Sequence, residues 1–154
     1  MPEGMTPNPQ QADPQQVAEA VGRAMYAADA ATRGLGIELL DIGPGRARLR
    51  MAVRPDMLNG HGICHGGFMF TLADSAFAFA CNSYNKAAVA QRADISFLAM
   101  VPHDAVLTAE AREMAGGGRS GVYDIELRDQ HGKLVGLFRG HSRQIKGEVV
   151  PGLT

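Results

Sequence analysis

The chemistry most readily available to this chain lies in residues 68–81, its longest apolar stretch, which reads FMFTLADSAFAFAC and carries one acidic side chain, Asp74. The stretch is rich in Ala, Leu, Met and Phe and poor in β-branched residues, so we expect a helix. On a helical period its polar residues fall on one narrow stripe, formed by Thr71, Asp74, Ser75 and Asn82. No lysine or arginine lies within the helix to pair with Asp74. Because a buried carboxylate without a partner is costly, Asp74 is either functional or satisfied structurally, by loop amides or by an arginine such as Arg92.

Two glycines, Gly66 and Gly67, stand where this helix begins. The first N–H groups of a helix have no partner within it, and they point outward at the positive end of the helix dipole. An oxygen that carries negative charge is favoured there, and glycine lets a substrate approach the backbone closely. The sequence therefore predicts an oxyanion hole on the same helix as a carboxylate.

The spacing of these two groups has a consequence for assembly. Gly66 and Asp74 are eight residues apart, which is about 12 Å along an α-helix. One reacting carbonyl cannot touch both within a single chain. Two copies of the helix, antiparallel across a two-fold axis, would bring Gly66 of one chain near Asp74 of the other. If the two residues form one catalytic site, we expect at least a dimer with two sites at its interface.

Two further patterns suggest metal or nucleotide binding and are better explained otherwise. His61, Cys64 and His65 lie together, but the chain offers no second pair of ligands for a structural zinc site, so we expect no metal. Cys64 and His65 are sequence neighbours whose side chains diverge, which argues against a nucleophile–base pair. Residues 116–121, GGGRSG, match the dinucleotide-binding pattern, but a strand rather than a helix follows them. We interpret them as a hairpin turn and expect no cofactor.

The composition of the N-terminal part of the chain changes after residue 16. Residues 1–16 are dominated by Pro and Gln, so we expect a disordered N-terminal tail there. One domain is expected over residues 17–147, followed by a C-terminal tail over residues 148–154. Pro14 is a favourable helix start, and the helix that follows is expected to end at Gly34 and Gly36.

Strands account for most of the remaining domain. Leu35, Ile37 and Leu39 predict a short first strand, and residues 46–54 alternate between apolar residues and arginines. After the glycine- and histidine-rich loop 59–67 and the central helix, four more strands are expected over residues 88–99, 105–115, 122–128 and 134–145. A helix that is apolar nearly all round must be covered on most sides. We therefore expect an α+β fold, with a long central helix wrapped by a curved antiparallel β-sheet.

Composition excludes several classes of function. The chain has 154 residues, a formal net charge of −1, 45% hydrophobic residues and two cysteines, which fits one globular domain without a disulfide framework. The charge gives no indication of nucleic-acid binding, and no apolar run is long enough to span a membrane. The N-terminus lacks the basic-then-apolar pattern of a signal peptide. We expect a cytoplasmic protein that binds neither nucleic acid nor membrane.

The segment HGICHGGFMFTLADSAFAFACNS, with GVYDIEL and LFRGHS later in the chain, closely resembles the hotdog-fold acyl-CoA thioesterases of phenylacetate degradation. The resemblance covers residues 35 to about 145. It implies a hotdog fold, in which two chains pair into a continuous sheet and dimers commonly associate into tetramers. It also implies hydrolysis of aryl-acetyl-type CoA thioesters to free acid and CoA.

The same resemblance implies roles for individual residues. Asp74 aligns with the catalytic carboxylate, as base or nucleophile, and Gly66 with the glycine whose amide polarises the thioester carbonyl. His65 and Asn59 align with residues that flank the carbonyl or orient water. His65 either acts as a general base or fixes the loop, and we favour the second role because histidine often makes structural hydrogen bonds.

Binding of the CoA thioester is expected to involve a further set of residues. Because coenzyme A carries phosphates, basic side chains should gather at the mouth of the channel. The residues expected to contact substrate or CoA are Gly67, Ser75, Arg119, Ser120 and Arg139. For each of the arginines, a solvated strand face is the alternative explanation.

Two other functions stay open at the level of sequence. A hydratase or dehydratase of acyl thioesters also places acid and base groups near a helix start, but it acts at the second and third carbons of the acyl chain. A non-catalytic acyl-CoA-binding regulator would use the same pocket without turnover, and it would be indifferent to the loss of the Asp74 carboxylate.

Overall fold

The computed structural model describes residues 12–116 and 118–154. Most of the expected N-terminal tail, residues 1–11, therefore lies outside the described residues, as does Gly117 of the expected hairpin turn. No helix in the described part of the chain is long and apolar enough to cross a membrane.

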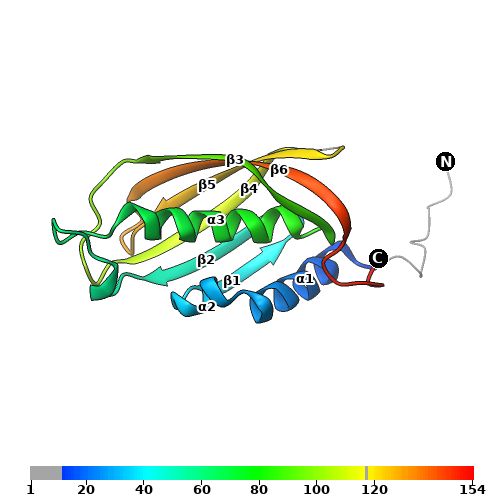
Figure 1. Cartoon of the computed structure of the whole chain (residues 1–154), viewed down its shortest axis with the longest axis horizontal. Coiled ribbons are helices and arrows are strands. Elements are labelled where there is room, and N and C mark those ends of the chain that lie inside the picture. The colour runs from blue at the N-terminus through cyan, green and yellow to red at the C-terminus, as the bar shows by residue number, and fades with distance from the viewer. Residues whose placement is uncertain (1–11, 117) are drawn as a thin grey trace, which may run out of the picture.

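In the described part of the chain, six antiparallel strands form one sheet, in the spatial order β1-β2-β4-β5-β6-β3. The strands are β1 Glu38–Gly43, β2 Arg46–Ala52, β3 Lys86–Phe97, β4 Val106–Ala115, β5 Ser120–Arg128 and β6 Leu134–Glu148. The sheet curves around the central helix α3, Gly66–Asn82, with β1 and β3 as its two edges (Figure 1). The wrapped-helix architecture expected from the sequence is confirmed.

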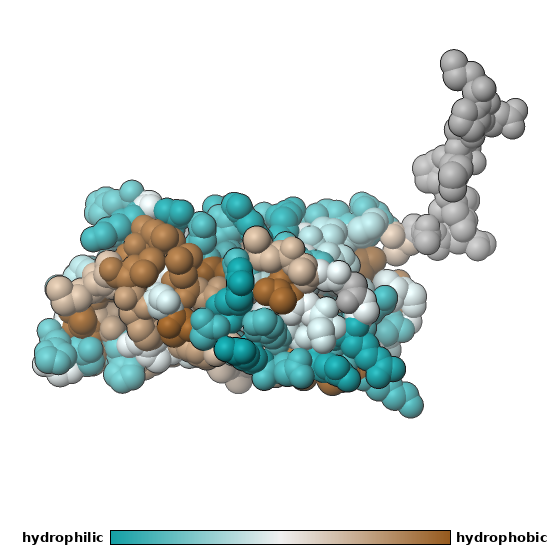
Figure 2. Space-filling view, turned by 90° about the horizontal axis from the view of Figure 1, so that it is seen from above, coloured by the Kyte–Doolittle hydropathy of each residue, from teal (hydrophilic) through white to brown (hydrophobic). Residues whose placement is uncertain are grey.

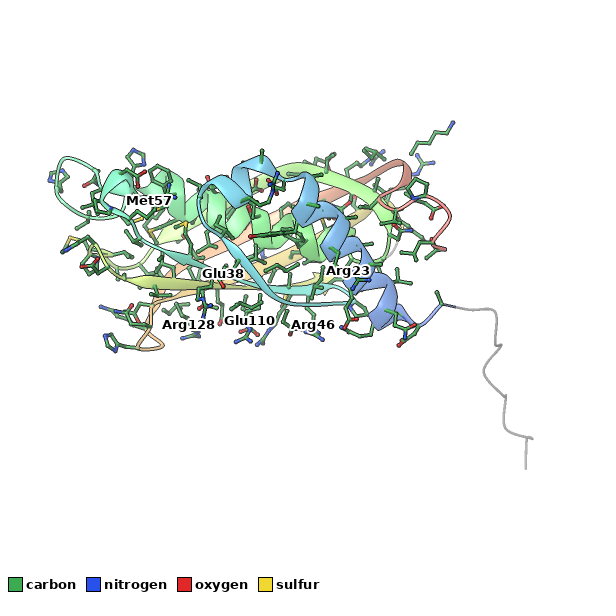
Figure 3. The ribbon with its side chains drawn as sticks, turned by 90° about the horizontal axis from the view of Figure 1, so that it is seen from below. Arg23, Glu38, Arg46, Met57, Glu110 and Arg128 are labelled. Carbon is green, nitrogen blue, oxygen red and sulfur yellow. The ribbon has the colours of Figure 1, made fainter. Side chains whose placement is uncertain are left out.

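The alternation along the central strands separates the two faces of the sheet. On β2 the apolar side chains Ala47, Leu49 and Met51 are buried, while the intervening arginines are exposed. Seen from below, Arg46, Glu110 and Arg128 point away from α3 on the outer face (Figure 3). The inner face is therefore the hydrophobic core, and the outer face is charged.

Helix α3 fills the concave face of the sheet with aromatic contacts. The Phe77 ring packs against Tyr123 of β5 and Phe138 of β6, with ring centroids 5.7 and 6.0 Å apart. A Cβ atom on Gly140 of β6 would lie only 2.8 Å from the Phe77 ring. The glycine thus allows the sheet to approach the helix closely.

The expected N-terminal helix is broken into two. Helix α1 runs over Pro14–Ala28 and α2 over Ala30–Gly34, with Asp29 between them. The Asp29 carboxylate accepts a hydrogen bond from the Thr32 N–H at 2.9 Å and so caps α2. The prediction of one continuous helix was wrong because this cap competes with helical continuation. The helical start at Pro14 was correct, so residues 14–16 of the expected tail belong to α1.

The first strand was also predicted at the wrong position. Leu35 is the C-cap of α2, and Gly36 has φ +69°, which turns the chain before the sheet begins. Ile37 is buried, but its N–H bonds back to the Thr32 carbonyl. The strand begins only at Glu38, because the alternation of Leu35, Ile37 and Leu39 spans a helix end and a turn.

The last residues are attached to the domain through the turn after α3. The buried Asn85 side chain accepts from the Val150 N–H at 2.7 Å and donates to Glu148 and to the Val150 carbonyl. Strand β6 itself extends to Glu148. Residues 148–150, which the sequence assigned to a C-terminal tail, are thus held against the body of the domain.

Candidate active site

The first backbone N–H groups of α3 differ in their partners. His65 is the N-cap of the helix, and its Nδ1 accepts a hydrogen bond from the Gly67 N–H at 2.9 Å. The Phe68 N–H donates to the His65 carbonyl at 3.0 Å. Among the described residues, none accepts a hydrogen bond from the N–H of Gly66, the first residue of the helix. Gly66 is therefore the donor available to a negatively charged oxygen.

Asn59 lies beside this donor. Its Oδ1 accepts from the His61 N–H at 2.9 Å, which closes the loop and orients the side chain. Asn59 and Gly66 line one cavity of about 570 Å³, whose other walls include Phe97, Leu98 and Met100. The structure thus brings together Asn59 and Gly66 from the predicted set, and it adds apolar walls that the sequence did not assign to the site.

Phe97, the last residue of β3, sits directly over the helix start. A Cβ atom on Gly66 would lie 2.8 Å from Cζ of the Phe97 ring, so a glycine is needed for this approach. The Phe97 side chain remains 54% exposed. An aromatic surface next to the free N–H suits a substrate that has an apolar group attached to a polar carbonyl.

Asp74 is half-buried near the middle of α3 and outside this cavity. Burial raises the pKa of its carboxyl, and the negative charge of Asp29 raises it further. No described residue, Arg92 included, forms a hydrogen bond or ion pair that would lower it. A half-buried carboxylate without a cationic partner is a good base or nucleophile.

Ser75 is occupied by a contact that the sequence did not predict. Its Oγ lies 2.9 Å from Oγ1 of Thr32, and the Thr32 hydroxyl donates to Asp29 at 2.6 Å. Asp29 and Thr32 therefore reach the turn of α3 that carries Asp74. Their sequence signal is an Asp followed three residues later by Thr, a helix-start pattern within an otherwise helical run. The substrate contact predicted for Ser75 stays a prediction.

The other members of the polar stripe are satisfied within the fold. The Thr71 hydroxyl donates to the Gly67 carbonyl at 2.9 Å. The Asn82 amide donates to the Ala88 carbonyl at 3.1 Å and accepts from the Ala88 N–H at 2.9 Å, which fastens the end of α3 to β3. Asp74 is thus the stripe member without a protein partner among the described residues.

A second cavity, of about 450 Å³, lies toward the C-terminal end of α3. Arg119 and Ser120 line it together with Lys86, and Cys81 forms part of its wall. Cys81 is two helical turns beyond Asp74, and burial together with the Asp74 charge raises the pKa of its thiol to about 12. Arg119 and Ser120, which were predicted to bind CoA, therefore share a cavity with Cys81, and Cys81 lies on the same side of α3 as Asp74.

Arg139 is placed differently. Its guanidinium makes two hydrogen bonds to the Asp124 carboxylate, at 2.6 and 2.8 Å, on the outer face of the sheet. This ion pair lowers the pKa of Asp124. Arg139 does not line the cavity that holds Arg119 and Ser120. The structure thus separates Arg139 from the other two predicted CoA contacts.

The cysteine- and histidine-rich loop does not assemble a metal site in the described part of the chain, where no three His, Cys, Asp or Glu side chains gather. Cys64 is buried, and burial raises the pKa of its thiol. The sequence 116–121 lies at the β4–β5 connection, as expected for a hairpin, with Gly117 outside the described residues.

The edge strand β3 leaves apolar side chains uncovered. Viewed from above, the molecule shows a large hydrophobic patch (Figure 2). The exposed large apolar residues of β3 and the loop after it are Val89, Phe97, Leu98 and Met100. An edge strand of 12 residues with such side chains is a surface that a further strand can extend.

Comparison with known proteins places these features in a family. Residues 61–136 match the model of the thioesterase superfamily. The chain is 48% identical to the acyl-coenzyme A thioesterase PaaI of Escherichia coli K12 over 126 residues, which cover 82% of this chain and 90% of that protein.

Solved structures agree with this match. The structure of the E. coli PaaI protein from the phenylacetic acid degradation operon superposes with a TM-score of 0.87 at 45% identity, covering 88% of this chain and 99% of that one. A mutant of the phenylacetic acid degradation protein PaaI from Thermus thermophilus gives 0.73 at 37% identity, over 76% and 100% of the two chains. A hypothetical thioesterase from Streptococcus pneumoniae, solved with coenzyme A, gives 0.69 at 25% identity, over 73% and 90%.

Proposed function

The chain belongs to the thioesterase superfamily and has the hotdog fold, and from this premise we propose that it hydrolyses aryl-acetyl-type CoA thioesters to free acid and CoA. The observation that carries the proposal is the pair formed by the free Gly66 N–H and the unpartnered Asp74 carboxylate on one helix. The aryl-acetyl preference rests on the E. coli relative, an acyl-coenzyme A thioesterase from the phenylacetic acid degradation operon, and on the apolar walls beside Gly66.

The site is formed between two chains. Within one chain the two groups are eight residues apart on α3, or about 12 Å. Antiparallel pairing of two β3 edges would cover the exposed apolar patch and set the two copies of α3 side by side in opposite directions. Asp74 then faces Gly66 of the partner subunit, and each dimer holds two sites. Association of two dimers into a tetramer is part of the same proposal.

In the proposed mechanism, negative charge develops on the oxygen of the thioester carbonyl and is stabilised by the site. As a general base, ionised Asp74 takes a proton from water while the water oxygen attacks the carbonyl carbon. The carbonyl oxygen becomes negative and accepts a hydrogen bond from Gly66 of the partner subunit. Collapse of the intermediate breaks the C–S bond, and the CoA thiolate takes up the proton that Asp74 received. The free acid remains.

Asp74 can also attack the carbonyl carbon itself. That route forms an anhydride between the Asp74 carboxyl and the acyl group as the CoA thiolate leaves, and water then hydrolyses the anhydride. Both routes need Asp74 ionised and the Gly66 N–H free. If water attacks the Asp74 carbonyl of the anhydride, oxygen from solvent enters Asp74 during a single turnover, which the general-base route never produces.

The loop residues support this chemistry in different ways. The Asn59 amide group is directed by its loop hydrogen bond and lies in the Gly66 cavity, where it can donate to water or to the acyl carbonyl. His65 fixes the helix start, because its Nδ1 is occupied by the Gly67 N–H. A ring nitrogen that already accepts a hydrogen bond is not free to act as a base. This supports the structural role of His65.

The CoA moiety is proposed to leave the site along α3. From Asp74 to Cys81 the helix rises by about 10 Å, which the pantetheine arm of CoA exceeds in length. The arm thus ends in the second cavity, where Lys86, Arg119 and Ser120 can bind phosphate oxygens.

The test is thiol release from a panel of acyl-CoAs that includes the phenylacetyl and hydroxyphenylacetyl thioesters. Asp74→Asn should lower turnover by at least about 100-fold. Asp41→Asn, which removes an exposed carboxylate paired with Arg46, serves as the matched control and should keep wild-type turnover. Double-bond absorbance without thiol release would indicate a hydratase or dehydratase. Tight CoA binding without turnover would indicate a regulator, and either result would overturn the proposal.

A further inference from the structure

Three side chains form a hydrogen-bonded chain that leads from the break between α1 and α2 to the centre of α3. Asp29 Oδ2 accepts from the Thr32 hydroxyl at 2.6 Å, and Thr32 Oγ1 lies 2.9 Å from Ser75 Oγ. Thr32 is 1% exposed and Ser75 is 9% exposed, so the chain is shielded from water. Neither hydroxyl belongs to the cavities described above.

The direction of this chain follows from proton counting. A carboxylate can only accept, so the single hydroxyl proton of Thr32 points to Asp29. The Thr32 oxygen must then accept the proton of Ser75. The Ser75 hydroxyl therefore has no proton left for any other acceptor. Its neighbour in sequence is Asp74, the carboxylate of the proposed site.

We propose that Asp29, acting through Thr32 and Ser75, is a positioning residue for Asp74. The chain fixes the turn of α3 that bears the Asp74 carboxylate, and it commits the Ser75 hydroxyl proton to Thr32. Asp74 is then without a donor among the described residues, and it is a stronger base for that reason. This inference rests on the proposed hydrolytic role of Asp74.

In the described part of the chain, the charge that raises the Asp74 pKa is that of Asp29. Asp29 contributes a negative charge from the α1–α2 junction, Cys81 lies two turns along α3, and Tyr123 on β5 faces the same helix. The inward side chains of β2 and of the buried part of β4 are apolar. Of these groups, Asp29 is the one that both acts on the Asp74 pKa through its charge and connects to the Asp74 turn by hydrogen bonds.

The first test removes the middle hydroxyl. Thr32→Val keeps the shape of the side chain and breaks the chain, and it should lower kcat by about tenfold with KM within about twofold, because small displacements of a reacting group are costly. Thr32→Ser restores the hydroxyl and should restore kcat. Ser83→Ala is the matched control, because Ser83 is another buried hydroxyl of the α3 end, bonded to the Gly45 N–H and the Ala80 carbonyl. It should lower the melting temperature and leave kcat unchanged.

The second test does not require turnover. Asp29→Asn keeps a side chain that caps α2 but removes the charge and frees a proton along the chain, so Asp74 should titrate at lower pH. The ¹³C signal of the Asp74 carboxyl reports this directly, and the acid limb of the pH–rate profile should move in the same direction. Ser83→Ala should leave both unchanged.

The outcomes distinguish a failure of the proposed hydrolytic function from a failure of the positioning role of Asp29. A wild-type protein that releases no thiol from any acyl-CoA overturns the hydrolytic function, whatever the titration shows. An active wild type whose kcat survives Thr32→Val, or an Asp74 titration that Asp29→Asn leaves in place, overturns the positioning role alone. A loss of kcat in Ser83→Ala equal to that in Thr32→Val would also contradict it, because the effect would then be one of general stability.

Discussion

His65 Nδ1 accepts the Gly67 N–H at 2.9 Å, and this bond leaves the preceding N–H, that of Gly66, as the free donor at the start of α3 among the described residues. The His65 cap and the proposed oxyanion hole therefore use adjacent N–H groups of the same helix start. We therefore propose that His65 stabilises the helix start and directs the loop and takes no part in proton transfer.

The cap role of His65 predicts a specific pattern of rescue. His65→Ala should destabilise the protein by about 1 kcal/mol, as the loss of an N-cap does, and lower kcat by no more than about tenfold. His65→Asn, a strong N-cap, should recover most of both. Denaturant unfolding and thiol-release kinetics measure the two effects. Loss of kcat by about 100-fold or more in both variants would instead indicate a general base.

Sharing of the site between chains predicts complementation. Gly66→Pro removes the N–H at the first helical position, where the proline ring suits the helical backbone but its Cβ must displace the Phe97 ring, and Asp74→Ala removes the carboxylate. Each variant alone should be inactive. A mixed dimer has one intact site and one site with both changes, so random mixing of equal amounts should recover about a quarter of wild-type activity.

The mixing experiment needs proof that chains exchange. Native mass spectrometry of differently tagged chains shows whether mixed dimers form. Mixed dimers without recovered activity would contradict a site shared across the interface.

The residues that we propose for the centre of this site could be singled out from the sequence because their signals are local. The polar stripe with Asp74 and the glycines at the helix start appear within one 17-residue segment, and the helix period and the free N–H groups follow from it directly. The helix pattern did not tell the Gly66 N–H from the Gly67 N–H, because the difference depends on the side-chain rotamer of His65; only the family resemblance singled out Gly66.

The parts that the sequence missed depend on contacts between distant residues. Phe97 covers Gly66 from 31 positions away, and Thr32 reaches Ser75 across 43 positions. The helix break at Asp29 is local, but it occurs in an alanine-rich run where helix propensity and capping compete. Packing against α3 decides that competition, because it buries Thr32.

The raised pKa of Asp74 predicts opposite effects on activity and stability. Activity needs the ionised form, so the acid limb of the pH–rate profile should lie above the usual range of an aspartate. The fold favours protonated Asp74, so its contribution to stability is present below the unfolded pKa and is lost as pH rises through the folded pKa.

Asp74→Asn should therefore be more stable than wild type at pH 7, by up to about 1 kcal/mol after allowance for solvent screening of a half-exposed group. The difference should shrink in acid, where wild-type Asp74 is also neutral. Thermal unfolding from pH 3 to pH 8 measures it. A variant less stable than wild type at pH 7 would mean that ionised Asp74 has a stabilising partner.

Hydrogen bonds from the Asn82 side chain link the end of α3 to the edge strand β3. Asn82→Ala removes hydrogen bonds to both backbone groups of Ala88 and leaves these partly buried groups unpaired, which should cost about 1–2 kcal/mol. If β3 is the dimer edge, the variant should also dissociate at higher protein concentration than wild type. Unfolding and sedimentation measure the two effects. Weakened stability with unchanged dissociation would place the dimer contact away from β3.

The separation of Arg119 from Arg139 predicts different effects on substrate binding. Arg119 lines the cavity proposed for the CoA phosphates, whereas Arg139 is paired with Asp124 on the outer face. Arg119→Ala should raise KM for acyl-CoA by about tenfold, the loss expected for one charge-assisted hydrogen bond, with little change in kcat. Arg139→Ala should leave KM within about twofold.

A truncated substrate separates phosphate binding from a general defect. The N-acetylcysteamine thioester of the same acid lacks the phosphates and adenosine, so Arg119→Ala and wild type should hydrolyse it with equal KM. If Arg119→Ala raises KM for both thioesters, Arg119 acts on the acyl end or on the shape of the site. If Arg139→Ala raises KM for acyl-CoA alone, the phosphates bind on the outer face of the sheet, because Arg139 does not line the second cavity.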